Sequence, residues 1–345
     1  MSLAVKHFNV VRMILKKSIF DENVINIILK YYWKNLKNKR KVLLDWIDNE
    51  WLSWDILSAN PNAIDLLENN QDKINWYMLC INPNAIDLLD DNKNKIYWES
   101  LSSNPNPNAI KLLSKKIQLE NTLKKEELYY LENKINWDAL SANPNAINLL
   151  ENNIDKINWP ILSENPNAIN LLENNEDKIN WDVLSANPNA INLLENNIDK
   201  INWKYLSKNS NNIDLLKNNK DKIHWPFLSL NSNAINLLEN NENKICWVSL
   251  SANPNAIELL TNNQDKISWI ALSSNPNAID LIKELIKYEN TLEIEQYNNL
   301  NEIDWYKLCL NPNAINLLKE NQDEIDWYYL SSNPSIFEDE PMPIV

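Results

Sequence analysis

One pattern of hydrophobic and polar positions repeats along most of the chain, and residues 179–197, INWDVLSANPNAINLLENN, show it in full. A tryptophan and a leucine lie three positions apart, so that both fall on one face of a short helix. After the Asn-Pro pair, an alanine, an isoleucine and two leucines recur at helical spacing. The pattern therefore predicts two short amphipathic helices in each repeat unit.

The repeat tryptophans give the period of the array. Successive ones are 22 residues apart in nine of eleven steps and 39 or 36 apart in the other two. Helices this short are marginal alone in water, so the units must stack to bury one continuous core. We predict an all-α fold, an α-solenoid of about twelve 22-residue two-helix repeats that forms an arc on the order of 100 Å long. The units are marked by Trp54, Trp76, Trp98, Trp137, Trp159, Trp181, Trp203, Trp225, Trp247, Trp269, Trp305 and Trp327.

Local signals place the ends of these helices. Asn180 precedes a repeat tryptophan and is expected to cap the first helix, because its side-chain oxygen can accept from a free backbone N–H. Asn187 is expected to cap the second helix, with Pro188 at the first helical position. The chain contains no glycine, so Asn196 or Asn197 is expected to take the left-handed conformation that ends the second helix. The tryptophan, which does not vary between units, is expected in the core.

A leucine-rich repeat is an alternative fold, because its period of 20–29 residues and its L-x-x-L-x-L-x-x-N-x-L pattern match in part. Aligning Trp181 with the first leucine places Leu184 and Asn189 correctly. The central position should be buried, but it holds charged residues in some units, Glu164 and Lys208 among them. The sequence therefore favours the two-helix unit.

Residues 1–50 precede the array, and we predict that they form an N-terminal helical cap, which a solenoid needs to cover its first apolar face. Within them, residues 20–32, FDENVINIILKYY, resemble the opening of an F-box, the short helical motif that docks substrate receptors onto ubiquitin ligases. The leucine–proline start of that motif is absent. The array spans residues 51–337 and ends in a truncated terminal unit, and residues 338–345 form an acidic, proline-containing tail.

Inserts near residues 114–134 and 283–302 lengthen the third and tenth units. Both contain the string ENTL, followed by glutamate, tyrosine and leucine before the next repeat tryptophan. The same insert at the same point indicates a variant unit with a longer second helix. Inserts at equivalent points project from one face of a solenoid, which is often its binding face.

The charge is unevenly distributed along the chain. The net charge is −14, yet residues 1–43 carry ten Lys or Arg against Asp21 and Glu22, which leaves about −22 on the rest. An acidic array disfavours nucleic acid as the partner, because phosphate binding needs Lys and Arg. No apolar run approaches the ~18 residues of a membrane span, and the N-terminus shows no signal peptide. We expect a soluble, intracellular protein that binds neither nucleic acid nor membrane.

The sequence offers no set of residues for catalysis or metal binding. The absence of glycine excludes the phosphate-binding loops that need it. The two histidines are His7 and His224, and His224 stands at a helix-capping position of the repeat. Cys80, Cys246 and Cys309 lie in separate units, which suggests a reducing compartment. We therefore expect no enzyme, no cofactor and no metal.

The two positions after each repeat tryptophan vary while their neighbours do not, as expected for sites exposed to solvent. Aromatic side chains often dominate the binding energy of protein interfaces. The aromatic residues at these variable positions are therefore the candidate protein-binding residues, namely Tyr77, Tyr205, Phe227, Tyr306, Tyr328 and Tyr329.

The unit INWxxLSxNPNAIxLLExN, together with the NPSIF ending at residues 333–337, resembles the repeat proteins that giant DNA viruses of the mimivirus type encode in many copies. The resemblance covers residues 51–337. It implies a viral, host-facing repeat protein with no established enzymatic activity, in the host cytoplasm or the virion interior. The expected function is a scaffold for a protein partner, and the alternative is an F-box-like adaptor that recruits a host ubiquitin ligase. The pattern carries no signal for the oligomeric state.

Overall fold

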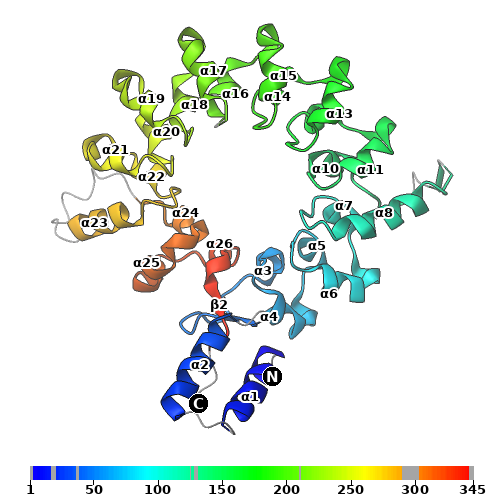
Figure 1. The fold of residues 1–345 in the computed structure, drawn as a ribbon, viewed down its shortest axis with the longest axis vertical. Helices are drawn as coiled ribbons and strands as arrows, with labels where there is room; N and C mark the ends of the chain where they lie inside the picture. The colour runs from blue at the N-terminus through cyan, green and yellow to red at the C-terminus, as the bar shows by residue number, and fades with distance from the viewer. Residues whose placement is uncertain are drawn as a thin grey trace.

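The computed structural model describes residues 3–16, 21–35, 39–124, 126–127, 131–209, 211–289 and 303–341. Across these residues the repeat units form an all-α solenoid that curves into a ring (Figure 1). The predicted two-helix repeat is confirmed. The leucine-rich-repeat alternative is wrong, because the strands found in the described residues are β1 (Lys41–Leu43) and β2 (Phe337–Asp339), both outside the helical units.

Two layers of helices build the ring (Figure 1). The first helices of the units form the inner layer: α3 (Trp54–Ala59), α5 (Trp76–Leu79), α7 (Trp98–Leu101), α10 (Trp137–Ala142), α12 (Trp159–Leu162), α14 (Trp181–Leu184), α16 (Trp203–Lys208), α18 (Trp225–Ser229), α20 (Trp247–Ser251), α22 (Trp269–Leu272), α24 (Trp305–Leu310) and α26 (Trp327–Leu330). The second helices form the outer layer: α4 (Ile64–Glu68), α6 (Ile86–Asp91), α8 (Ala109–Glu120), α11 (Ile147–Glu151), α13 (Ile169–Glu173), α15 (Ile191–Glu195), α17 (Ile213–Asn218), α19 (Ile235–Glu239), α21 (Ile257–Thr261), α23 (Ile279–Glu289) and α25 (Ile315–Glu320).

Short 3-10 helices complete the path of the chain. Most lead from a second helix to the next unit: η1 (Gln71–Lys73), η2 (Lys93–Lys95), η3 (Ile154–Lys156), η4 (Glu176–Lys178), η5 (Ile198–Lys200), η6 (Lys220–Lys222), η7 (Glu242–Lys244), η8 (Gln264–Lys266) and η11 (Gln322–Glu324). Two others follow a first helix: η10 (Pro312–Ala314) and η12 (Pro334–Ile336). In the last unit η12 forms the turn that precedes a second helix in other units, and β2 begins where that helix would start, so the unit is shorter.

The inserted units follow the prediction of a longer second helix. α8 has 12 residues and α23 has 11, whereas the other second helices have five or six. The rest of the first insert contributes Asn133, whose Oδ1 accepts from the backbone N–H of Trp98 at 2.7 Å. Residues 290–302 of the second insert lie outside the described residues.

The start of the first helix was predicted correctly. Asn180 has an extended backbone, and its side chain accepts from the N–H of Val183. The predicted start of the second helix is wrong: Pro188 and Asn189 form a turn, and α15 begins only at Ile191. The reason is that the preceding asparagine bonds to a neighbouring unit rather than to its own helix, as described below.

The left-handed helix ending was also predicted wrongly. Asn196 has φ −77° and Asn197 has φ −134°, so neither lies in the left-handed region. Instead, the Asn197 side chain donates to the carbonyl of Leu193 at 3.0 Å. This bond satisfies a carbonyl that the end of the helix leaves free, and no left-handed residue is needed.

A ladder of buried asparagines joins the units. The Nδ2 of Asn187 donates to the carbonyls of Ser163 at 3.1 Å and Asn165 at 3.0 Å, both in the preceding unit. Its Oδ1 accepts from the N–H of Asn189 at 3.0 Å and holds the turn before α15. The equivalent buried residues, which bond to the preceding unit in the same way, are Asn60, Asn82, Asn104, Asn143, Asn165, Asn209, Asn231, Asn253, Asn275, Asn311 and Asn333.

The repeat serine forms a second link between units. Ser185 Oγ donates to the carbonyl of Trp181 at 2.8 Å and accepts from the N–H of Asn202, in the next unit, at 2.9 Å. It thereby ends one helix and fixes the start of the next one. These polar links are buried between apolar residues, which makes them specific for the correct stacking of units.

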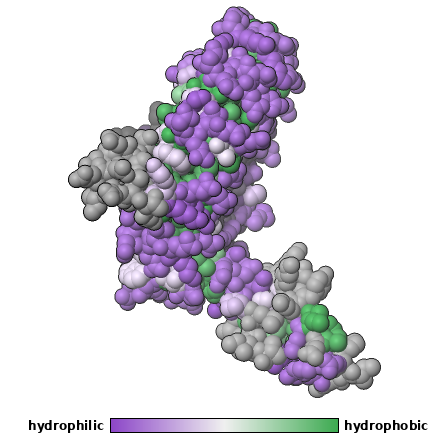
Figure 2. Space-filling view, turned by 90° about the vertical axis from the view of Figure 1, so that its left-hand side faces the viewer, coloured by the Kyte–Doolittle hydropathy of each residue, from purple (hydrophilic) through white to green (hydrophobic). Residues whose placement is uncertain are grey.

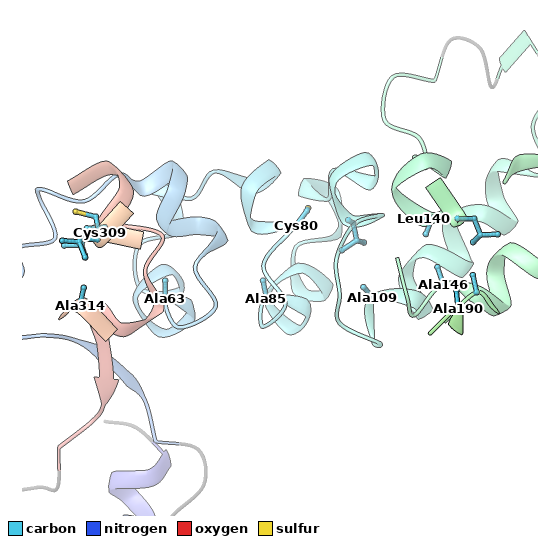
Figure 3. Close-up of a cluster of buried hydrophobic side chains, with 14 of the residues drawn as sticks. Ala63, Cys80, Ala85, Ala109, Leu140, Ala146, Ala190, Cys309 and Ala314 are labelled. Carbon is cyan, nitrogen blue, oxygen red and sulfur yellow. The ribbon is translucent and has the colours of Figure 1, made fainter. Parts of the chain in front are cut away.

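A single hydrophobic core runs between the two layers, from Ile47 to Phe337. Figure 3 shows Ala63, Ala85 and Ala109 at equivalent places in successive units. These alanines are fully buried, as are the repeat leucines. The small alanine lets the inner and outer layers approach each other closely.

The repeat tryptophans are only partly buried, so the prediction of a core position needs correction. One side of each ring packs against the core, and in most units a lysine that follows the tryptophan in the chain lies over the ring, usually from the 3-10 helix that leads to the next unit. Lys200 Nζ, for example, is 4.3 Å from the Trp181 ring centroid. Such a cation–π contact contributes about 0.5–1 kcal/mol at an exposed site. Equivalent lysines are Lys73, Lys95, Lys116, Lys156, Lys178, Lys222, Lys244 and Lys266.

The two ends of the array meet, so the arc predicted from the sequence is a closed ring (Figure 1). Asn60 of the first unit donates to the carbonyls of Ser331 at 3.0 Å and Asn333 at 3.1 Å, both in the last unit. The N–H of Ser53 donates to Ser331 Oγ at 2.8 Å. These bonds repeat those between consecutive units, so the last unit precedes the first as though the chain were continuous.

An antiparallel pair of strands straps the junction. β1 pairs with β2 in the register Lys41↔Asp339 and Leu43↔Phe337. Asp339 also lies 2.8 Å from Lys39 Nζ and 2.9 Å from Lys41 Nζ, and the hydrogen bonds from these lysines lower the pKa of its carboxyl group. At the same junction Trp51 packs on Trp327 with ring centroids 4.7 Å apart, in the place that a lysine takes elsewhere.

The N-terminal helices stand apart from the ring. α1 (Leu3–Leu15) and α2 (Glu22–Asn35) form a hairpin with a small core of its own, made by Phe8, Ile25, Leu29 and Trp33. Figure 1 places this hairpin outside the ring, and Figure 2 shows a green apolar patch on it. In this structure the first unit packs against the last unit, and the hairpin does not take that place.

Asn212 is a polar residue at a repeat position that holds alanine in most other units. Its side chain is 1% exposed, and neither its Nδ2 nor its Oδ1 has a hydrogen-bond partner in the structure. The preceding unit has Ala190 there. We expect Asn212→Ala to raise the free energy of unfolding by about 2 kcal/mol, because it removes a buried polar group without a partner. Urea unfolding measures the change, and the converse variant Ala190→Asn should lower stability by a similar amount. A destabilised Asn212→Ala protein would contradict this.

Candidate binding surface on the inner wall of the ring

The residue directly after each repeat tryptophan faces away from the core. Helical residues are about 100° apart, so this residue points about 160° from the repeat leucine two positions later. The leucine, for example Leu184, is buried against the outer layer. Asp182, which directly follows Trp181, therefore faces the interior of the ring. We call these twelve positions the inner wall, and all of them are exposed: Asp55, Tyr77, Glu99, Asp138, Pro160, Asp182, Lys204, Pro226, Val248, Ile270, Tyr306 and Tyr328.

Five consecutive units present apolar side chains on the inner wall. These residues are Pro226, Val248, Ile270, Tyr306 and Tyr328, which we call the apolar arc. Val248 is 61% exposed, Ile270 49% and Tyr328 52%. Scattered apolar residues on a surface are ordinary, but a contiguous set marks a site of interaction.

The opposite part of the inner wall is acidic. Its carboxylates are Asp55, Glu99, Asp138 and Asp182, which we call the acidic arc. Asp138 and Asp182 each accept a hydrogen bond from the amide of the capping asparagine in the next unit, at 2.8 and 2.9 Å. These bonds hold the carboxylates in place without neutralising them. The inner wall therefore has an apolar side and a negatively charged side.

The structure places all six predicted aromatic residues on the inner layer of helices. Tyr306 and Tyr329 lie with ring centroids 3.9 Å apart, and Tyr328 and Tyr329 with centroids 5.2 Å apart. Removal from water, followed by the influence of Tyr306, Asp326 and Tyr328, raises the pKa of Tyr329. These three tyrosines form one cluster at the end of the apolar arc.

The other predicted aromatics lie elsewhere around the ring. Tyr205 and Phe227 have ring centroids 6.3 Å apart, and Lys204 Nζ lies 5.2 Å from the Phe227 ring. Tyr77 is separated from both clusters and pairs with Tyr97 at 5.7 Å. The six residues thus form three groups rather than one site.

Sequence reasoning missed the residues that connect these groups. Val248 and Ile270 lie on the inner wall in the two units between Phe227 and Tyr306. They were passed over because only aromatic residues were chosen at the variable positions. The signal was present in the sequence, since hydrophobic residues follow the repeat tryptophan without interruption from unit eight to unit twelve.

Grooves flank the acidic arc. One of about 540 Å³ has a lining that includes Trp76, Tyr77, Lys95, Tyr97 and Asn133. Another, of about 310 Å³, lies in the next units and has a lining that includes Glu99, Glu132, Lys134 and Asp138. Both grooves are open rather than enclosed.

Two cysteines and a histidine of the described residues serve structural positions of the repeat. Burial raises the pKa of both Cys80 and Cys309 to about 11, which keeps these thiols protonated and poor nucleophiles. Cys80 Sγ accepts from the N–H of Tyr97 at 3.3 Å, in the role of the repeat serine. His224 caps α18 by accepting from the N–H of Phe227. Within the described residues no group of three or more His, Cys, Asp or Glu is placed to hold a metal ion.

The described part of the chain has no helix with both the length and the apolar character needed to span a membrane. Comparison of the chain with models of known families finds no match. Comparisons with curated proteins and with solved structures likewise find no match.

Proposed function

We propose that this protein is a non-enzymatic scaffold that binds a protein segment against the inner wall of its ring. The observation that carries the proposal is the apolar arc of five exposed residues in consecutive units. Burying such a strip would remove several hundred Å² of apolar surface from water, at roughly 25 cal/mol per Å². The neighbouring aromatic clusters supply side chains that commonly anchor interfaces.

The rigidity of the ring supports the same function. Each unit is fixed by asparagine and serine links to both of its neighbours, as Asn187 and Ser185 illustrate. A closed ring also has no free end at which units can fray. A binding surface that is already ordered loses less conformational entropy when a partner binds.

The resemblance to repeat proteins of mimivirus-type viruses supports a viral origin and a host-facing role. On this proposal the partner is a host or viral protein, met in the host cytoplasm or the virion interior. The acidic character of the array, about −22 outside residues 1–43, supports a protein rather than a nucleic acid as the partner.

We expect the variant Val248→Asp/Ile270→Asp to lose peptide binding by about tenfold or more, because each aspartate removes apolar contact from the middle of the arc. The probe is a displayed library of random peptides, selected on the purified wild-type protein. Selected peptides should be rich in apolar and basic residues. Their affinity for both proteins can be measured by fluorescence polarisation.

The matched control is Asn170→Asp/Asn192→Asp, which adds the same two charges at exposed positions of the outer layer. It should bind the selected peptides as the wild type does. Equal loss in the control, or full binding by the inner-wall variant, would show that the apolar arc is not the binding surface.

A second candidate is the F-box-like adaptor, and the exposed face of the N-terminal hairpin favours it. Val10, Met13 and Ile14 of α1 are 51%, 55% and 60% exposed, and together they form a stripe suited to a partner helix. Deleting residues 1–38 should abolish co-purification of a host ubiquitin ligase while the ring stays folded. Unchanged recovery of the ligase would rule this function out.

A further inference from the structure

The hairpin has an apolar surface that its own core does not use. On α1 the exposed large apolar residues are Val10, Met13 and Ile14, and on α2 they are Val24 at 41% and Ile27 at 69% exposure. Each helix thus carries apolar side chains at spacings of three or four, which lie on one face. Figure 2 shows the apolar patch set apart from the ring. We call these five residues the hairpin stripe.

The charge of the hairpin is opposite to that of the ring. Residues 1–35, which include both helices of the hairpin, contain six Lys or Arg and two acidic residues, whereas the residues after position 43 carry about −22. The inner wall of the ring has two different sides, the apolar arc and the acidic arc. Its one lysine, Lys204, lies between them. A basic element with an apolar stripe is therefore complementary to the inner wall in both respects.

The dimensions of the two parts agree. Packed helices lie about 8–10 Å apart, so twelve inner helices give a ring of roughly 34 Å between opposite axes. Subtracting one helix diameter of about 10 Å leaves an opening of roughly 24 Å. A two-helix hairpin measures about 20 Å by 10 Å in cross-section. It can enter the opening and contact both arcs at once.

In this structure the hairpin lies outside its own ring, next to the strapped junction. Lys41 begins β1, only six residues after the end of α2 at Asn35, and β1 is paired with β2 at the rim. Figure 1 shows the hairpin projecting outward from that point. In this arrangement, the ring that it can enter is that of another molecule.

We infer that the occupant of the inner wall is the hairpin of a second copy of this chain, so that the molecules join head to tail. This inference rests on the proposed function, since it names the partner of the same surface. The interface is heterologous: each copy uses its stripe on one neighbour and its wall on another. Such a contact does not close on two molecules by itself and extends into a chain of rings.

The first test is sedimentation velocity of the full chain over a range of protein concentrations and salt concentrations. Larger species should form as protein concentration rises, and their association should weaken by about tenfold or more in high salt, which screens the attraction between hairpin and acidic arc. The variants Met13→Glu/Ile14→Glu on the stripe and Val248→Glu/Ile270→Glu on the wall should each be monomeric. All four residues are exposed, so both variants should keep the wild-type circular dichroism spectrum.

A mixture of the two variants gives the sharpest test. One protein has an intact wall and the other an intact hairpin, so together they should form a one-to-one dimer and nothing larger. Control variants with glutamates at Asn170 and Asn192 should assemble as the wild type does.

The inference is overturned if the wild-type chain is monomeric at every concentration, or if association persists in either variant alone. A monomeric chain whose stripe captures a ubiquitin-ligase subunit would assign the hairpin to that partner instead. The proposed function is tested separately: if the wall still binds the selected peptides while the chain is monomeric, only the self-docking inference fails.

Discussion

Replacing Asn187 by alanine is expected to lower the free energy of unfolding by about 3 kcal/mol, a large effect for the loss of one small side chain. The variant leaves the buried carbonyls of Ser163 and Asn165 without their donor, and the N–H of Asn189 without its acceptor. Each buried polar group without a partner costs about 1–3 kcal/mol. The change removes the link between two units and also the turn that starts α15.

Equilibrium unfolding in urea measures this effect. The control is Asn192→Ala, which removes an exposed asparagine only five residues away and should change stability by less than about 0.5 kcal/mol. A similar small change for Asn187→Ala would mean that the ladder contributes little. Asn187→Asp should be as damaging as the alanine variant, because its carboxylate cannot donate to the two carbonyls and would be a buried charge.

The period and the helix pair could be read from the sequence because they depend on neighbouring residues. Trp181 and Leu184 share a face through helical geometry, and Asn180 caps through a bond to a residue three positions away. The longer second helices were also readable, since the two inserts repeat the same string. Such local relationships are visible in any single unit.

The role of the second asparagine was not readable in the same way. A residue before proline looks like a helix cap, which would use the side-chain oxygen of Asn187 as an acceptor for its own helix. Its donors instead reach residues 22 and 24 positions back in the chain. Only the stacking of units brings those carbonyls near Asn187, so the sequence pattern favoured a helix cap instead.

The position of the tryptophan was misjudged for a related reason. A residue that does not vary between units can be constrained by a partner as well as by burial. Lys200 lies over the Trp181 ring, and equivalent lysines recur in the short 3-10 helices, so the tryptophan has such a partner in most units. The inner wall was predicted only in part. The variable positions after each tryptophan were identified, but only their aromatic residues were chosen, so Val248 and Ile270 were missed.

Closure of the ring depends on small angles that no single unit reveals. Twelve units close when each turns by about 30° relative to the last, and the twist and curvature of a solenoid follow from such small rotations per repeat. A few degrees more or less per unit would give a helix or an open arc. Closure is therefore the feature of the fold that most needs a direct test.

The test is Asn60→Ala, which should lower the free energy of unfolding by about 3 kcal/mol, as much as Asn187→Ala does. In the closed ring Asn60 donates to the carbonyls of Ser331 and Asn333 across the junction. In an open arc the first unit would have no predecessor, and Asn60 would keep only its bond from the N–H of Asn62. Its replacement would then cost about 1 kcal/mol.

The loss of unfolding free energy in Asn60→Ala, compared with the loss in Asn187→Ala, therefore distinguishes a ring from an arc. Both variants change the same residue type at the same place in the unit, so differences in helix propensity cancel. Asn62→Ala adds a second readout, because Asn62 donates to the carbonyl of Pro334 at 2.8 Å across the same junction. If Asn60→Ala lowers the free energy of unfolding by only about 1 kcal/mol and Asn62→Ala unfolds at the wild-type urea concentration, while Asn187→Ala loses about 3 kcal/mol, the ends do not meet in solution. In that case the apolar arc and the acidic arc would no longer face each other across a common opening.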